Sequence, residues 1–177
     1  EKISEILKSF QLESVLEVGS GNGFNLLALA ILNPEVTKWA GLELTSSGVK
    51  KANSLLKNPP VKELIYVTGR SALEISEALA KVKLEFYLGN MFSLPFISDT
   101  FDIIFSHLAL EQIPNNYLLA FADIYRVTKS YALFIEEFKE AQQNIFQRIQ
   151  LRNVNYFSAS FQETKKFYPG APFENSF

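Results

Sequence analysis

The sequence predicts an α/β domain with a doubly wound, mainly parallel central sheet and helices on both faces. Short apolar stretches typical of strands alternate along the chain with amphipathic stretches typical of helices. A glycine-rich turn joins the first strand to a long apolar helix, as in parallel sheets that bind ligands at their carboxyl edge. Of the 177 residues, 47% are hydrophobic, which is enough for one domain with its own core. The sequence leaves open whether the last strand of the sheet is missing.

Each element in the first half of the chain has a local signal. Apolar residues recur at helical spacing near the N-terminus, which predicts an opening helix. Asn33-Pro34 ends the helix after the glycine turn, and Thr45-Ser46-Ser47 offers N-cap oxygens to the next helix. That helix stops at Asn58-Pro59-Pro60, because proline cannot continue a helix. The expected elements are a helix over 2–11, a strand over 14–18, a helix over 22–32, a strand over 38–44 and a helix from about 45 to 57.

The second half repeats the alternation of strand and helix. Three short runs of mainly apolar residues predict strands, and an amphipathic segment between the last two predicts a helix. Because the strands are expected to be parallel, the polar residues that follow them fall at one edge of the sheet. The expected strands cover 84–88, 101–106 and 131–136, and the expected helix covers about 116–128.

Residues 59–83 do not fit the minimal form of such a fold, which needs only one helix and a short loop at this point. Residues 61–67 predict an extra strand, and residues 71–82 predict a helix with Leu73, Leu79 and Val82 on one side. We expect a peripheral insertion here. The alternative is a lid over a substrate, since long inserted segments are often functional.

Composition excludes several classes of function. The formal net charge is −2, and Lys and Arg are scattered rather than clustered, which argues against a nucleic-acid-binding protein. No apolar run approaches the roughly 20 residues of a membrane-spanning helix and no signal peptide is visible, so we expect a cytoplasmic protein. Cysteine is absent, which excludes disulfides, thiolate metal sites and a cysteine nucleophile. The chain begins at Glu1 and lacks a clear final strand, so we expect a longer protein with ends or internal segments missing here.

The most informative motif is the turn after the first strand, Glu17-x-Gly19-Ser20-Gly21-x-Gly23. Strand, glycine turn and helix together present backbone N–H groups and the positive end of a helix to a polar ligand. In a dinucleotide fingerprint the third glycine comes one residue later, where this chain has phenylalanine. The pattern resembles motif I of the class I S-adenosylmethionine-dependent methyltransferases. The resemblance implies a Rossmann-like methyltransferase fold, in which Glu17 holds the methionine end of S-adenosylmethionine and the glycine turn passes beneath its carboxylate and ribose.

An acid also ends the second expected strand. This acid is Glu43, which Leu44 follows. A carboxylate at this offset from the glycine turn can accept hydrogen bonds from both ribose hydroxyls of an adenosine-containing cofactor. Dinucleotide-binding folds use an acid in a similar place, so Glu43 supports an adenosine cofactor without deciding which one. The alternative is a solvated acid at a strand end.

A second stretch carries the same resemblance. Residues 89–96, Gly-Asn-Met-Phe-Ser-Leu-Pro-Phe, look like a stretch common in the small-molecule, type 11 subgroup of these methyltransferases. In that subgroup an acid meets the adenine amino group, and Asn90 replaces the acid here. An amide oxygen can still accept that N–H, without the charge-assisted part of the interaction. We expect Asn90 and Met91 in the cofactor pocket.

A third resemblance surrounds the fourth expected strand. Residues 98–115 resemble the family's stretch there, and residues 122–128 resemble its helix before the fifth strand, so that the matches span about residues 13–136. Ser106 ends the strand, and we expect it in the cofactor pocket. His107, the only histidine, follows where the methyl donor is expected. We predict that His107 is a general base that deprotonates a substrate hydroxyl, since imidazole titrates near neutrality; the alternative is a wall of the cofactor pocket.

The resemblance implies methyl transfer by in-line displacement, with S-adenosylhomocysteine as the product. Glu111 and Glu136 are further candidates for the base, and a structural role explains each of them more simply. No metal cluster is visible, and the motif that resembling enzymes use on amide or adenine nitrogens is absent. We therefore expect a small-molecule acceptor, methylated at a hydroxyl oxygen, and no nucleic-acid partner. The amphipathic segment 137–152 and the aromatic residues after it are expected to make 137–177 a cover for the substrate.

The prediction for the whole chain is one methyltransferase domain over residues 1–177. One alternative is a catalytically inactive protein of the same fold that binds a ligand or regulates another enzyme, and Asn90 supports it. The other is an NAD-dependent oxidoreductase. The early third glycine argues against it, and so does the lack of a Tyr-x-x-x-Lys pair at the expected place. Nothing in the sequence indicates the oligomeric state.

Overall fold

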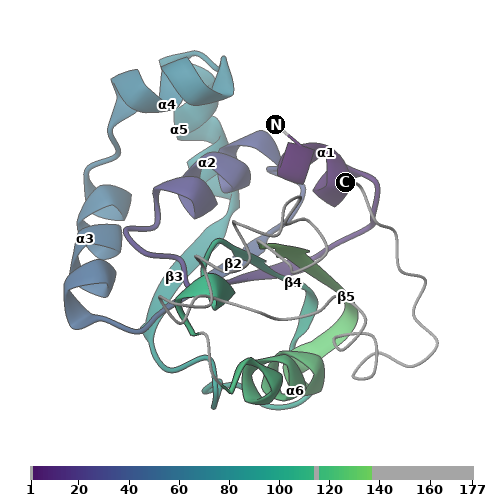
Figure 1. The fold of residues 1–177 in the computed structure, drawn as a ribbon. Coiled ribbons are helices and arrows are strands. Elements are labelled where there is room, and N and C mark those ends of the chain that lie inside the picture. Colours follow the sequence, from purple (N-terminus) through teal and green to yellow (C-terminus); the bar gives the residue numbers. More distant parts are fainter. Residues whose placement is uncertain (1, 114–115, 137–177) are drawn as a thin grey trace, which may run out of the picture.

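The computed structural model describes residues 2–113 and 116–136. In this part of the chain, five parallel strands form one sheet in the order β3-β2-β1-β4-β5 (Figure 1). Helices pack on both faces, which confirms the predicted doubly wound α/β fold. No strand follows β5 within the described residues. The strands are β1 Ser14–Val18, β2 Lys38–Glu43, β3 Lys83–Leu88, β4 Phe101–His107 and β5 Thr128–Ile135.

The central strand β1 is buried along its whole length, because β2 and β4 pair with its edges and helices cover its faces. Strands in this position have nearly continuous apolar sequences, which explains why the short apolar run at residues 14–18 predicted a strand. Val18, at the end of β1, lies opposite Leu42 in β2 and Ser106 in β4. The glycine turn that follows Val18 therefore begins level with the carboxyl ends of both neighbouring strands.

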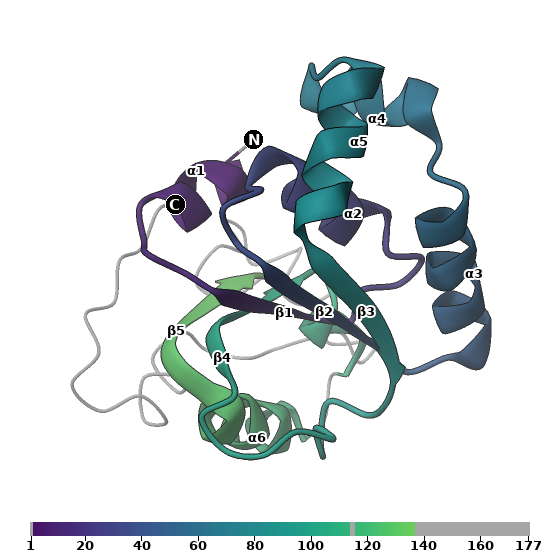
Figure 2. The same ribbon diagram turned by 180° about the vertical axis from the view of Figure 1, so that it is seen from behind.

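The helices form two unequal layers. Helices α1, α2, α4 and α5 lie on one face, α3 flanks β3 on the same side, and α6 lies on the opposite face (Figure 2). The larger core packs α2 against Trp39 and Phe105, and the smaller core packs Ile124 of α6 against Leu16 and Ile104. The helices are α1 Lys2–Lys8, α2 Phe24–Leu32, α3 Ser46–Lys57, α4 Val61–Thr68, α5 Ala72–Lys81 and α6 Tyr117–Val127, with a 3₁₀ turn at Leu110–Gln112.

The prediction of an extra strand over 61–67 is wrong, because this segment is helix α4. Leu64 of α4 and Ile75 of α5 are buried in the larger core, where both helices pack against α2. Gly69 ends α4 in the left-handed conformation, and a capping box at Ser71 begins α5. Whether this helical pair acts as an insertion or as a lid stays a prediction.

The last described strand starts earlier than expected. β5 begins at Thr128, directly after α6, whereas the sequence predicts a start at residue 131. The predicted substrate cover over 137–177 lies outside the described residues. None of the helices that the structure describes has both the length and the apolar character needed to cross a bilayer.

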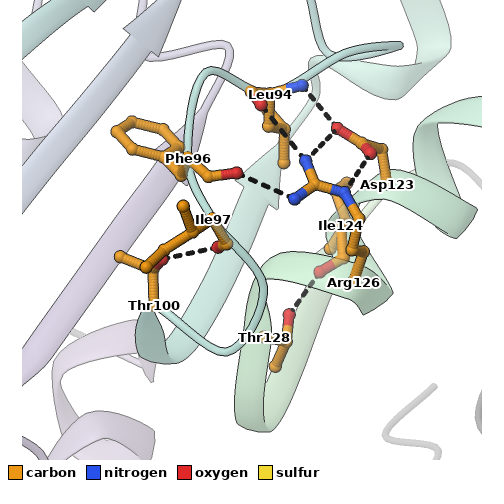
Figure 3. A network of polar contacts seen from close by, with 8 residues as sticks. All are labelled: Leu94, Phe96, Ile97, Thr100, Asp123, Ile124, Arg126 and Thr128. Carbon is orange, nitrogen blue, oxygen red and sulfur yellow. Dashed lines mark hydrogen bonds and ion pairs between the residues drawn. The ribbon is translucent and has the colours of Figure 1, made fainter.

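An ion pair on α6 holds the loop between β3 and β4. Arg126 pairs with Asp123 at 2.7 Å and donates to the carbonyl oxygens of Phe96 (2.8 Å) and Leu94 (3.2 Å). Asp123 also accepts the N–H of Leu94 (Figure 3). The loop has no regular secondary structure of its own and carries Asn90, so this anchor fixes the path of the chain next to the candidate site.

Replacing Arg126 by alanine is expected to lower the free energy of unfolding by about 1.5–3 kcal/mol, since it removes several hydrogen bonds of a charged group. Urea unfolding of the two proteins measures this cost. The matched control is Arg70→Ala, which removes an exposed pair with Glu74 worth about 0.5 kcal/mol or less. Equal costs for the two variants would show that the Arg126 contacts do not hold the loop.

Candidate functional site

The predicted site residues gather at the carboxyl edge of the sheet, because all five strands are parallel and the residues lie at or just after the carboxyl ends of β1, β2, β3 and β4. In α/β sheets this edge is where ligands bind. β1 contributes its buried acid and the glycine turn that follows it, and the ends of β2, β3 and β4 each contribute a pair of residues. The set is Glu17, Gly19, Ser20, Gly21 and Gly23 from β1 and its turn, Glu43 and Leu44 from β2, Asn90 and Met91 after β3, and Ser106 and His107 from β4.

The glycine turn is fixed to the end of β2 by backbone hydrogen bonds. The N–H groups of Gly19 and Ser20 both donate to the Leu42 carbonyl oxygen, at 2.8 and 2.9 Å. The Gly23 N–H donates to the Ser20 carbonyl oxygen at 2.9 Å, which closes the turn just before α2 begins. The turn is therefore a rigid part of the sheet edge rather than a free loop.

Close packing explains two of the three glycines, and open space surrounds the other. A Cβ on Gly19 would lie 2.3 Å from the Ala109 Cβ, and a Cβ on Gly23 would lie 2.5 Å from the Phe86 ring. Nothing in the described part of the chain comes within 4 Å of the place where a Cβ on Gly21 would lie. Gly21 is thus the position where a ligand can approach the turn most closely.

Glu43 is held in place by the residues around it. One carboxylate oxygen accepts the Gly21 N–H at 3.2 Å, and the other accepts the N–H and hydroxyl of Thr45 at 2.9 and 2.6 Å. Gly48 in α3 makes room for this side chain, since a Cβ there would lie 2.6 Å from the Glu43 Cγ. The carboxylate is half-exposed at the sheet edge, next to the exposed Leu44.

The Glu17 carboxyl group is buried without a hydrogen-bond partner at one of its oxygens. Its exposed fraction is 3%, and neither its Oε2 nor the buried Ser20 Oγ has a partner among the described residues. Burial raises the pKa of Glu17 from 4.5 to about 8. Ser20 Oγ lies over Gly41, the residue opposite Glu17 in β2. Two buried polar atoms without a partner among the described residues thus lie in and beside the glycine turn. Such atoms are rare in proteins, and binding of a polar ligand would explain them.

Asn90 forms a local turn at the start of the β3–β4 loop. Its Oδ1 accepts the Phe92 N–H at 3.0 Å, and its backbone oxygen accepts the Ser93 N–H at 3.0 Å. The preceding residue, Gly89, donates its N–H to the Glu43 carbonyl oxygen at 3.0 Å, which places the exposed Asn90 beside the end of β2. Met91 is half-buried in the same loop.

The end of β4 forms a tight turn. Ser106 is fully buried, and its hydroxyl donates to Glu136 Oε1 at 2.7 Å. His107 follows, half-buried at the strand end, and Leu108 adopts the left-handed conformation at φ 51°. The Ala109 N–H then donates to the same Glu136 oxygen at 3.2 Å. The structure does not describe the side chain of Glu111, the other acid considered as a base.

Four contributors to this edge are absent from the predicted site. Thr45 and Gly48 position Glu43, Phe86 packs against Gly23 and Gly41, and Ala109 supports Gly19. The sequence predicted Thr45 as an N-cap. The hydrogen bond of its hydroxyl to Glu43 could not be predicted, because it depends on how β2 ends. The contacts of Phe86 and Ala109 join distant segments and have no local signal.

A model of the methyltransferase domain, type 11, matches residues 16–135. This match covers more than half of the chain, from within β1 to the end of β5, and it includes the predicted cofactor-binding residues and His107. The chain belongs to the methyltransferase domain family. It is therefore an enzyme of the methyltransferase class, and the family implies S-adenosylmethionine as the methyl donor. This result confirms the resemblance stated from the sequence and argues against the NAD-dependent alternative.

Solved structures share the fold of this methyltransferase. The YcgJ protein of Bacillus subtilis is 21% identical, with a TM-score of 0.62 over 95% of this chain and 67% of that one. A SAM-dependent methyltransferase of Methanosarcina mazei is 19% identical, with a TM-score of 0.62 over 90% of this chain and 66% of that one. A SAM-dependent methyltransferase of Aquifex aeolicus is 23% identical, with a TM-score of 0.53 over 79% and 66%. The chain thus spans about two thirds of the length of these proteins.

A search of curated protein sequences found no relative of this chain.

Proposed function

We propose that this methyltransferase binds S-adenosylmethionine at the carboxyl edge of its sheet and methylates a hydroxyl oxygen of a small-molecule acceptor. The observation that supports the binding site most directly is the pair of unpartnered, buried atoms Glu17 Oε2, in β1, and Ser20 Oγ, in the glycine turn. Burial disfavours the ionised form of Glu17, and the ammonium group at the methionine end of the cofactor would stabilise that form.

The other residues at the edge match the remaining parts of the cofactor. Glu43 is already oriented by Thr45 and Gly21, and its free lone pairs would accept hydrogen bonds from the ribose hydroxyls. Asn90 Oδ1 keeps one lone pair after binding Phe92, and this lone pair would accept an N–H of the adenine. Leu44 and Met91 would supply apolar contacts to the ring. Ser106 is buried and bound to Glu136, so its contribution would be indirect.

When bound, S-adenosylmethionine supplies a sulfonium methyl group that is already activated for in-line displacement. The protein's main task is then to align the acceptor and exclude water, which can contribute on the order of 7–11 kcal/mol for well-oriented reactants. We assign His107 as the general base: an imidazole nitrogen would take the proton of the acceptor hydroxyl while the methyl group leaves the sulfonium sulfur, with S-adenosylhomocysteine as the leaving group. The scattered Lys and Arg residues and the net charge of −2 support a small acceptor rather than a nucleic acid.

Calorimetric titration with S-adenosylhomocysteine tests the proposed cofactor site. Glu43→Ala is expected to weaken binding by about 10- to 100-fold, the usual cost of losing hydrogen bonds to a charged group. Glu35→Ala removes an exposed acid at the opposite, amino edge of the sheet, and we expect it to leave the affinity unchanged. If the wild type binds no S-adenosylhomocysteine, the chain is better described as an inactive protein of this fold, the alternative that the Asn90 substitution favours.

A further inference from the structure

Glu136, the residue after β5, hydrogen-bonds to the turn at the end of β4. We propose that Glu136 is a positioning residue: it holds the turn of residues 106–109 in the shape that supports the cofactor-binding glycine turn and places His107. This inference rests on the proposed function, since it concerns the same cofactor site.

Glu136 joins both ends of the turn through one oxygen atom. Its Oε1 accepts the hydroxyl of Ser106 at 2.7 Å and the N–H of Ala109 at 3.2 Å. β4 and β5 pair up to His107 and Ile135, and the Leu108 N–H still donates to the Ile135 carbonyl oxygen at 3.0 Å. Beyond that bond, Glu136 provides the next link between the two strand ends.

The turn needs such a link because its conformation is unfavourable. Leu108 has a φ of 51°, a left-handed conformation that costs a residue with a Cβ roughly 1–2 kcal/mol. Its side chain is 42% exposed, so Leu108 is held only in part by burial. Strained backbone persists where surrounding contacts determine it, and such places cluster at functional sites. Three hydrogen bonds join residues 106–109 to the end of β5, and two of them end on Glu136.

Residues 106–109 in their turn pack against the glycine turn that follows β1. Ala109 is buried and packs so closely on Gly19 that a Cβ on Gly19 would lie 2.3 Å from the Ala109 Cβ. A shift of Ala109 would therefore move Gly19, and with it the backbone that approaches the cofactor. His107 lies between Ser106 and Leu108, so the same link fixes where the imidazole emerges from β4. Glu136 thus acts on the site through Ala109 and His107 without touching the cofactor.

Three variants with distinct hydrogen-bonding capacity test this role by S-adenosylhomocysteine calorimetry. Glu136→Ala removes the acceptor and is expected to weaken binding at least tenfold. Glu136→Gln keeps an oxygen at the same place and is expected to stay within threefold of the wild type. Ser106→Ala removes one donor but leaves the Ala109 bond, so its affinity should fall between these two. A residue with only a structural role would lower the melting temperature of the alanine variants without this ordering of affinities.

Hydrogen exchange of the peptide amides at Leu108 and Ala109 gives a second readout. We expect faster exchange in Glu136→Ala than in the wild type, and near wild-type exchange in Glu136→Gln. The control is Glu85→Ala: Glu85 accepts the Tyr87 hydroxyl and pairs with Lys83 on β3, but makes no contact with this turn.

The outcomes separate this proposal from the proposed function. If the wild type and Glu136→Ala bind S-adenosylhomocysteine equally, the positioning role is wrong and the cofactor site stands. If the wild type itself does not bind, the cofactor site is wrong, and exchange at Ala109 alone reports whether Glu136 holds the turn. Should Glu136→Ala fail to fold, Ser106→Ala and Glu136→Gln still decide the matter, since only the former should weaken binding.

Discussion

The free energy of unfolding is expected to fall by several kcal/mol as the pH rises from about 5 to about 8.5, and Glu17 is the cause. Burial alone raises the pKa of Glu17 from 4.5 to about 8 in the folded protein. The opposite residues in β2 and β4 are Gly41 and Phe105, and α2, which packs on this face, has no charged residue. Among the described residues no cation therefore compensates the ionised form.

The direction of the effect follows from the two pKa values. Between pH 4.5 and about 8 the folded state keeps the Glu17 proton, whereas the unfolded chain has lost it. The folded state therefore binds more protons in this range, and stability decreases with rising pH. Each pH unit of the shift corresponds to about 1.4 kcal/mol, so the whole shift is on the order of 4–5 kcal/mol. The stabilisation is complete below about pH 4.5 and lost above about pH 8.

Urea unfolding at several pH values, with Glu17→Gln for comparison, measures this effect. Glutamine has the size of the protonated acid and cannot ionise, so the variant should lose the pH dependence and be more stable than the wild type above about pH 7. Glu63→Gln removes an exposed carboxylate on α4 and should follow the wild-type curve. Parallel curves for the wild type and Glu17→Gln would mean that a partner not described here neutralises the carboxylate.

The sequence predicted the sheet and its binding edge because these depend on short-range signals. Apolar runs locate all five strands, and the acids Glu17 and Glu43 lie within or at the end of their strands, so their place at the carboxyl edge follows from parallel topology. The mistaken strand over 61–67 shows where this reasoning fails. A short run of mixed apolar residues fits a strand or a helix, and the decision lies in the packing of Leu64 against α2.

The supports of the site could not be predicted from the sequence. Ser106 was predicted as a cofactor-binding residue from its place at the strand end, but no local signal indicates that its buried hydroxyl donates to Glu136, 30 residues further along the chain. Ala109 supports Gly19 only because β4 lies next to β1. Sequence patterns identify the site residues that a single strand or turn carries. Contacts between turns that follow different strands appear only once the register of the sheet is known.

Two glycines of the same turn are expected to respond to alanine in different ways. Gly19→Ala places a Cβ 2.3 Å from the Ala109 Cβ at a φ of 79°. We expect a loss of stability of about 2–5 kcal/mol, from the left-handed conformation and from overpacking together. Urea unfolding of Gly19→Ala, alone and combined with Ala109→Gly, measures the two contributions. The second substitution removes the overlap and should restore only the part due to overpacking, so failure to restore any stability would contradict this packing.

Gly21→Ala should instead impair ligand binding more than folding. Gly21 has a φ of 55°, and an added Cβ would find nothing of the described chain within 4 Å. The substitution should therefore lower the free energy of unfolding only by the cost of the left-handed backbone, about 1–2 kcal/mol. Gly69, at the end of α4, has the same kind of conformation and open surroundings, so Gly69→Ala measures that backbone cost at a place remote from the site. We expect equal losses of stability in the two variants, and a loss of S-adenosylhomocysteine affinity of tenfold or more in Gly21→Ala alone. Because the two substitutions match in stability, any difference in affinity reports the space above Gly21 itself, and equal affinities would show that the cofactor does not use it.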